Sequence, residues 1–174
     1  MPDDREQQPM GSQPLRTTFP VSVVMERRPI HDNRWTTESW QAIGVTVGST
    51  HDGLKENPVP LVSNGSVTQF LWHGLRIELF ADEAESYYHN LTVPNPGCYV
   101  IARPADNGKP EPVLVTLSFD AAQAYQEGDE TVYSVALPPE LYRAAEAFVI
   151  EHYVPEKRKK RKRDNWKEQS NART

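Results

Sequence analysis

Apolar and polar residues alternate along several short stretches of the chain, with the two-residue period of a half-buried β-strand. In the first stretch Val21, Val23 and Met25 alternate with polar or smaller residues. Further along the chain, Leu75 and Ile77 alternate in the same way with charged residues. This period, or a run of β-forming residues, predicts strands over residues 21–27, 35–47, 70–80, 85–93, 98–103, 113–119 and 131–135. Residues 36–39 suit a short bulge or turn equally well.

A helical period replaces the alternation near the end of the patterned region. Apolar residues between Leu141 and His152 recur at helical spacing, after Pro138, Pro139 and Glu140 provide a favourable helix start. A shorter helical stretch is expected over residues 121–126, capped by Asp120 and ended by Gly128. Residues 48–68 show no convincing period and are expected to form a variable surface loop.

This order of elements predicts an α+β, mostly-β fold. We expect an antiparallel curved sheet or open barrel of six to seven strands, closed by one C-terminal helix. The stretches without apolar pattern set the boundaries: residues 1–16 form a disordered arm, 17–153 a single β-rich domain, and 154–174 a basic disordered tail. Strands do not alternate with helices, which argues against a doubly wound nucleotide-binding fold.

Charge separates the domain from the tail more sharply than the overall value of −5 suggests. Residues 1–156 hold 10 Lys and Arg against 22 Asp and Glu, a net charge of −12. Residues 157–174 hold 9 against 2, a net charge of +7. The chain therefore carries two blocks of opposite charge, and each needs its own interpretation.

The sequence lacks the common catalytic and cofactor signatures. The single cysteine, Cys98, rules out a disulfide within the chain, and a buried small residue is its expected role. No glycine-rich phosphate loop is present, and the five histidines show no metal-site spacing. We therefore expect no enzyme activity, no cofactor and no metal. Without a signal peptide or a long apolar stretch, the expected location is cytoplasmic.

An arginine–tryptophan group is the most distinctive cluster within the acidic domain. Arg27 and Arg28 end the first predicted strand, Arg34 and Trp35 begin the second, and Trp40 follows. If the two strands form a hairpin, the arginines meet near its turn and could hold a carboxylate or phosphate. Pairing with the acids of the same domain is the alternative. Most aromatic residues should pack in the core, with one or two left for an exposed recognition surface.

The tail contains seven consecutive cations, which repel one another and favour an extended, solvated segment. They are Lys157, Arg158, Lys159, Lys160, Arg161, Lys162 and Arg163. Such a segment suits nucleic acid, an anionic membrane surface or an acidic protein, or it folds back on the acidic domain. The negative charge of the domain argues against dedicated DNA binding.

Four blocks of the sequence carry a family resemblance. They are FPVSVVMERRP, NRWTTESWQAIGV, ELFADEAESYYHNLT and LPPELYRAAEAFVIEHYVPEKRKKRKR. In order and spacing they resemble an uncharacterised bacterial family, a domain of unknown function typically encoded beside formate dehydrogenase genes. The resemblance implies an accessory role in maturing or assembling a molybdenum-containing formate dehydrogenase, and it supplies no catalytic residues.

Our leading hypothesis is a non-enzymatic accessory protein that binds a protein partner, either a formate dehydrogenase subunit or an assembly factor. The arginine–tryptophan group would give specificity, and the tail would add electrostatic attraction. The alternative is a nucleic-acid or anionic-surface binder that acts through the basic tail.

Overall fold

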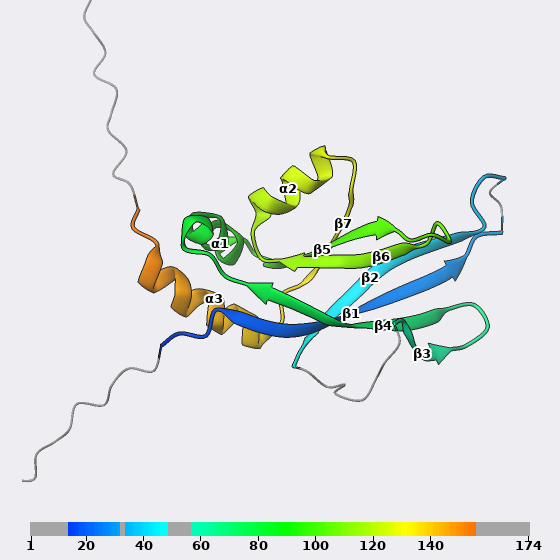
Figure 1. The fold of residues 1–174 in the computed structure, drawn as a ribbon, viewed down its shortest axis with the longest axis horizontal. Coiled ribbons are helices and arrows are strands. Elements are labelled where there is room, and N and C mark those ends of the chain that lie inside the picture. Colours follow the sequence, from blue (N-terminus) through cyan, green and yellow to red (C-terminus); the bar gives the residue numbers. More distant parts are fainter. Residues whose placement is uncertain (1–13, 32–33, 49–56, 156–174) are drawn as a thin grey trace, which may run out of the picture.

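Antiparallel strands form two sheets, which lie one above the other in Figure 1. The computed structural model describes residues 14–31, 34–48 and 57–155. Most of the expected N-terminal arm, part of the expected loop and the cationic run of the tail lie outside these residues. Within the described residues, the predicted mostly-β, antiparallel fold is confirmed.

The larger sheet has the strand order β2–β1–β4–β3. Its strands are β1 (Thr18–Pro29), β2 (Glu38–Val47), β3 (Val59–Ser63) and β4 (Thr68–Glu78). The alternation predicted for the first strand is visible as burial, because Val23 and Met25 are completely buried. On β1, Val23 pairs with Val45 on one side and Trp72 on the other, so one face of the sheet is apolar across three strands.

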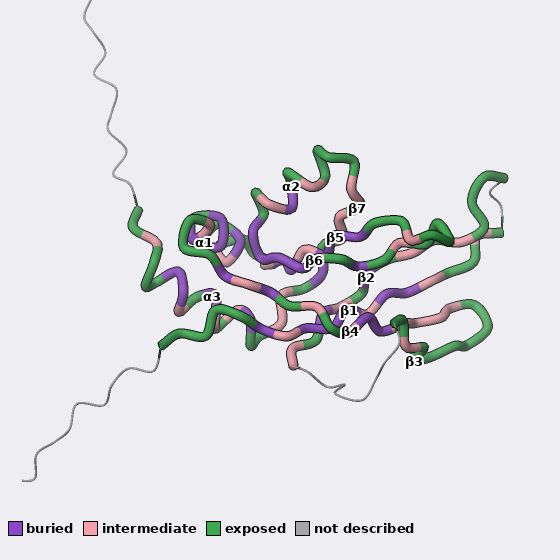
Figure 2. Tube along the Cα trace, viewed as in Figure 1, coloured by how far each residue is buried: buried purple, intermediate pink, exposed green. Residues whose placement is uncertain are grey.

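The smaller sheet has the order β6–β5–β7. It contains β5 (Gly97–Pro104), β6 (Pro110–Thr116) and β7 (Thr131–Ala136). Strand β6 approaches β4, and β7 approaches β2, so the core lies between the two sheets. Figure 2 shows the buried residues running through β1 and β5 and on into α1 and α3.

The expected single curved sheet or open barrel is wrong, because the strands divide into two sheets after β4. Residues 85–93, predicted as a strand, belong instead to helix α1 (Ala84–Thr92), which follows the short 3₁₀ helix η1 (Ala81–Glu83). Ala84 and Tyr87 are buried three residues apart, a helical spacing that the β-forming tyrosines obscured. The segment between β4 and β5 is therefore helical, and the strand predicted there is absent.

Strand β3 lies inside the segment expected to be a loop. Val59 and Pro60 pair with Leu71 and Phe70 of β4. The proline masked the strand pattern in the sequence, yet proline is tolerated at the edge of a sheet, which is where β3 lies. Likewise, β2 begins at Glu38, so the expected strand start at Trp35 falls in the preceding turn.

The two remaining helices follow their predictions closely. Helix α2 (Phe119–Glu127) is capped by Ser118, whose Oγ accepts a hydrogen bond from the Ala121 N–H at 3.1 Å, and not by Asp120 as expected. Helix α3 (Pro139–His152) has proline in its first turn, as predicted. Its buried residues Leu141 and Phe148 join the core, and the helix packs against α1.

Two ends of the molecule can be distinguished in Figure 1. Helices α1 and α3 lie at one end, which we call the helical end. The β1–β2, β3–β4 and β5–β6 connections lie at the other, which we call the hairpin end. The distinction matters because the sequence-predicted arginine–tryptophan group belongs to the hairpin end.

Candidate functional site

Two of the predicted site residues come together at the hairpin end. Arg27 on β1 and Trp40 on β2 are paired across the two strands, and Thr68 of β4 is the partner of Arg27 on the other side. Paired residues share one face of a sheet. Met25, two residues before Arg27, is completely buried on this face, so the group lies where the core between the sheets reaches the surface.

Trp40 forms an aromatic cluster with two side chains of β4. Its ring centroid lies 5.5 Å from that of Phe70 and 6.2 Å from that of Trp72, and the last two are 6.1 Å apart. These separations suit tilted and edge-to-face aromatic contacts. Trp72 is buried, whereas Trp40 and Phe70 are partly exposed. The cluster is thus an extension of the core that remains accessible from outside.

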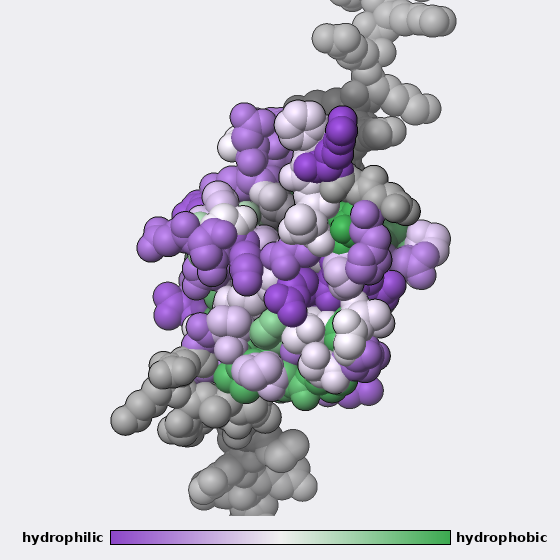
Figure 3. Space-filling view, turned by 90° about the vertical axis from the view of Figure 1, so that its right-hand side faces the viewer, coloured by the Kyte–Doolittle hydropathy of each residue, from purple (hydrophilic) through white to green (hydrophobic). Residues whose placement is uncertain are grey.

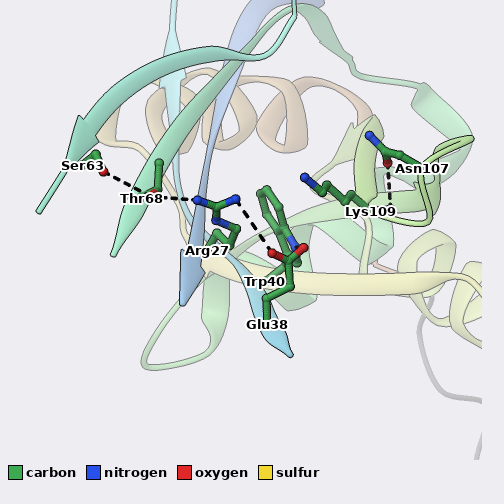
Figure 4. A network of polar contacts seen from close by, with 7 residues as sticks. All are labelled: Arg27, Glu38, Trp40, Ser63, Thr68, Asn107 and Lys109. Atoms are coloured by element: carbon green, nitrogen blue, oxygen red, sulfur yellow. Dashed lines mark hydrogen bonds and ion pairs between the residues drawn. The ribbon is translucent and has the colours of Figure 1, made fainter. Parts of the chain in front are cut away.

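Polar contacts fix the orientation of this cluster (Figure 4). The indole N–H of Trp40 donates a hydrogen bond of 2.9 Å to one carboxylate oxygen of Glu38, and Nη1 of Arg27 lies 3.9 Å from the other. Nη2 of Arg27 donates to the Thr68 hydroxyl at 3.2 Å, and the guanidinium lies 5.6 Å from the Phe70 ring centroid. Glu38 therefore links the charged and aromatic parts of the site.

A pocket of about 310 Å³ opens beside the cluster. Trp40, Phe70 and Trp72 line it on one side, and the β5–β6 hairpin contributes Lys109 and Glu111 on the other. Figure 4 shows the Lys109 side chain extending towards Trp40. The pocket therefore combines an aromatic wall with a rim of both charges.

Hydrogen bonds hold both sides of the pocket in place. The Asn57 side chain donates to the His73 carbonyl at 2.9 Å and accepts from its N–H at 3.0 Å, which fastens the segment before β3 onto β4. In the β5–β6 hairpin, the N–H of Ala105 donates to the Lys109 carbonyl at 2.8 Å, and the Lys109 N–H donates to the Asn107 side chain at 2.9 Å. The pocket is consequently formed without a ligand.

Arg28 does not join Arg27. Consecutive residues of a strand point to opposite faces, and Arg28 reaches Glu26 on the other face of β1, with Nε 2.6 Å from Oε1. Gln69 donates a 3.1 Å hydrogen bond to the same carboxylate. The Gln69 and then the Arg28 hydrogen bonds lower the pKa of Glu26 below its usual value. Two of the three arginines in the predicted group, Arg27 and Arg28, thus pair with glutamates of the same domain.

Arg34 and Trp35 lie in the turn between β1 and β2, apart from the strand pairing. Both are exposed, and Trp35 exposes 93% of its surface. Seen from the hairpin end, the molecule is mostly hydrophilic, and hydrophobic side chains gather towards the lower edge of the view (Figure 3). Leu61 and Val62 of β3 add exposed apolar surface to the same end. Large exposed apolar side chains are typical of interaction sites when they gather in this way.

The other candidate sites are easily placed. Cys98 is completely buried, and burial raises the pKa of its thiol to about 12, so its thiolate is scarce at neutral pH. Among residues 14–31, 34–48 and 57–155, no group of three or more His, Cys, Asp or Glu could hold a metal ion. In the same ranges, no helix has the length and apolar character needed to span a membrane. The predicted tail residues 157–163 lie outside these ranges.

The sequence did not reveal the partners of Trp40. Phe70 and Trp72 stand two residues apart, which places them on one face of a strand, but only the strand order brings that face beside Trp40. Lys109 and Glu111 carry no signal that links them to the site, because their hairpin belongs to the other sheet.

A family model matches residues 20–163 of the chain, and its family is described as "Protein of unknown function (DUF3305)". The comparison with curated proteins and the comparison with solved structures returned no match.

Proposed function

The chain belongs to the DUF3305 family, and we propose that it is a non-enzymatic accessory protein that binds a protein partner through its hairpin end. The observation that carries this proposal is the aromatic pocket of Trp40, Phe70 and Trp72, with the exposed Trp35 on the turn that precedes β2. A charged rim of Lys109 and Glu111 borders the pocket.

These features match the usual anatomy of a protein interface. Binding energy concentrates in a few aromatic and arginine side chains, and surrounding polar residues exclude water and select the partner. Trp40 is held by Glu38, so little side-chain entropy is lost when a partner packs against it. The rim carries both charges, which favours a partner surface that is itself mixed in charge.

The proposed partner is a formate dehydrogenase subunit or one of its assembly factors, in the cytoplasm. This choice rests on the family resemblance of the sequence blocks between residues 19 and 163, and not on the shape of the pocket. In this proposal, the cations at residues 157–163 add long-range attraction, because such attraction raises association rates without requiring a fixed geometry.

Calorimetric titration of the full chain against purified formate dehydrogenase from the same organism tests the proposal. We expect the wild-type protein to bind, and Trp35→Ala and Trp40→Ala each to weaken binding by about 30-fold, the effect of losing an anchor worth about 2 kcal/mol. Ile150→Ala is the matched control, because Ile150 is a large apolar residue 79% exposed on α3, at the helical end. Its binding should equal that of the wild type.

Two results would count against the proposal. Absence of binding by the folded wild-type protein removes this partner, and equal weakening by Ile150→Ala removes the hairpin end as the interface. Deletion of residues 157–174 provides a separate comparison. If the deletion abolishes binding while both tryptophan variants bind normally, the alternative of an anionic-surface or nucleic-acid binder acting through the tail is favoured.

A further inference from the structure

A second groove, separate from the aromatic pocket, lies where the smaller sheet meets α3. It has a volume of about 600 Å³ and is bordered by the turn at residues 94–97, the end of β7 and the first two turns of α3. This volume is within the range of small-molecule sites. The proposed partner interface does not involve any of its lining residues.

Buried hydrogen bonds fix the walls of this groove. The Asn90 side chain, 3% exposed, donates to the carbonyls of Gly97 at 2.8 Å and Leu117 at 2.9 Å, and accepts from the Gly97 N–H at 2.9 Å. The Leu137 N–H donates to the Pro96 carbonyl at 3.1 Å, which joins the end of β7 to the turn. The groove is therefore a preformed feature of the fold.

The charge of the groove is unusual for this domain. Arg143 on α3 lines it, and no Asp or Glu is among its lining residues, although residues 1–156 carry a net charge of −12. Glu140 and Glu146 lie one turn away from Arg143 on α3 but do not line the groove, so Arg143 is the only charged side chain among the described residues that line it. The groove is thus a cationic position in an acidic molecule.

In its contacts, Arg143 also differs from four other arginines of the described residues. Arg27, Arg28, Arg76 and Arg103 each lie within ion-pair distance of a glutamate. Arg143 has no ion pair or side-chain hydrogen bond with any residue in the described part of the chain. A guanidinium has five donors in a planar fork that fits a carboxylate, so this one has its full capacity available.

We propose that this groove binds a small organic acid with one carboxylate and an apolar body. Arg143 holds the carboxylate, and the hydroxyls of Ser134 and Tyr142 supply further hydrogen bonds. The apolar body packs on Leu137 and Pro139. One carboxylate is specified because the groove offers one cation, and a second negative charge would meet the acidic domain without a partner.

Nuclear magnetic resonance of the ¹⁵N-labelled full chain tests the proposal, with 3-phenylpropionate as the probe and 3-phenylpropanamide as its neutral counterpart. We expect saturable shifts of the backbone amides of Asn95, Gly97, Leu137 and Arg143 with the acid. The amide should bind at least about tenfold more weakly, since a charge-assisted hydrogen bond contributes more than a neutral one. Arg143→Gln should weaken binding of the acid by a similar factor, and Arg143→Lys by less.

Arg76→Gln is the matched control, because Arg76 is an exposed arginine on β4 outside the groove. Its titration should match that of the wild type. The proposal is overturned if the named amides do not shift up to the solubility limit of the acid, if the neutral amide binds equally well, or if Arg143→Gln leaves the affinity unchanged. None of these outcomes depends on whether the hairpin end binds a partner.

Discussion

The two ends of the molecule differ in how their polar and aromatic side chains are arranged. At the helical end, polar side chains are buried and satisfied: Asn90 makes three hydrogen bonds, and Tyr87 makes two while exposing 1% of its surface. At the hairpin end, aromatic side chains reach the surface, and Trp35 is almost fully exposed. Large apolar side chains are exposed at both ends, including Ile150 on α3, but only the hairpin end gathers its aromatic residues around a pocket. The comparison indicates that buried hydrogen bonds hold the helical end together, whereas the hairpin end combines a buried aromatic base with exposed aromatic surface.

The largest expected effect is at Asn90. Asn90→Leu removes all three hydrogen bonds and leaves the Gly97 N–H and two buried carbonyls without their partner. We expect the free energy of unfolding, measured in urea, to fall by about 3 kcal/mol or more. Asn95→Ala, in the adjacent exposed turn, should change it by less than about 0.5 kcal/mol. Equal effects of the two substitutions would show that the buried amide does not hold this end together.

At the helical end, Tyr87 should give the next largest effect after Asn90. Its hydroxyl donates to Glu83 at 2.8 Å and accepts from the Phe80 N–H at 3.2 Å, which connects α1 to η1 and to the residue that precedes η1. Tyr87→Phe keeps the ring and should lower the free energy of unfolding by about 2 kcal/mol. Tyr88→Phe, on the exposed neighbouring residue, is the control and should have little effect. If Tyr87→Phe leaves the free energy of unfolding unchanged, the hydroxyl does not have the stabilising role assigned to it.

The buried thiol of Cys98 should make the free energy of unfolding depend on pH in the alkaline range. Burial raises the pKa of the thiol to about 12, above its value of about 8.5 in an unfolded chain. The stability due to the protonated thiol is therefore complete below about pH 8.5 and is lost as pH rises towards 12. Between pH 8 and 10, the wild type should lose about 1–2 kcal/mol more than Cys98→Ala, which has no thiol to titrate. Parallel pH profiles of the two proteins would show that the thiol is not held protonated.

Trp35 should give the smallest effect on stability. Its side chain is 93% exposed, so Trp35→Ala should change the free energy of unfolding by less than about 0.5 kcal/mol. Trp72→Ala, at a residue 6% exposed in the same end of the molecule, should cost about 3 kcal/mol because it leaves a cavity. A large cost at Trp35 would mean that this side chain supports the fold, and the contrast between the two ends would lose its basis.

The sequence predicted the fold best where one pattern decided the structure. Alternation located β1 and β4, and helical spacing with an initial proline located α3. The sequence pattern gave a wrong prediction where two structural tendencies competed. The adjacent Tyr87 and Tyr88 favour a strand, but burial of Ala84 and Tyr87 on one side makes the segment a helix.

For the candidate site, the sequence proposed Arg27 and Trp40 but not the residues that surround them. The pairing of β1 with both β2 and β4 is a long-range feature that no local pattern encodes, so Phe70 and Trp72 could not be assigned to the cluster. The position of Arg28 could have been predicted from the sequence, because strict alternation places it on the opposite face of the strand from Arg27. The β5–β6 hairpin joins the pocket only through the packing of two sheets.

Site-specific photo-crosslinking tests the central claim most directly. A benzophenone amino acid placed at position 61 on β3, where Trp35 and Trp40 remain intact, and separately at position 150, should distinguish the hairpin end from the helical end in the presence of formate dehydrogenase. We expect a crosslink to a formate dehydrogenase subunit from position 61 and none from position 150. Crosslinking from position 150 alone, or from neither position when both proteins are folded, would contradict this claim.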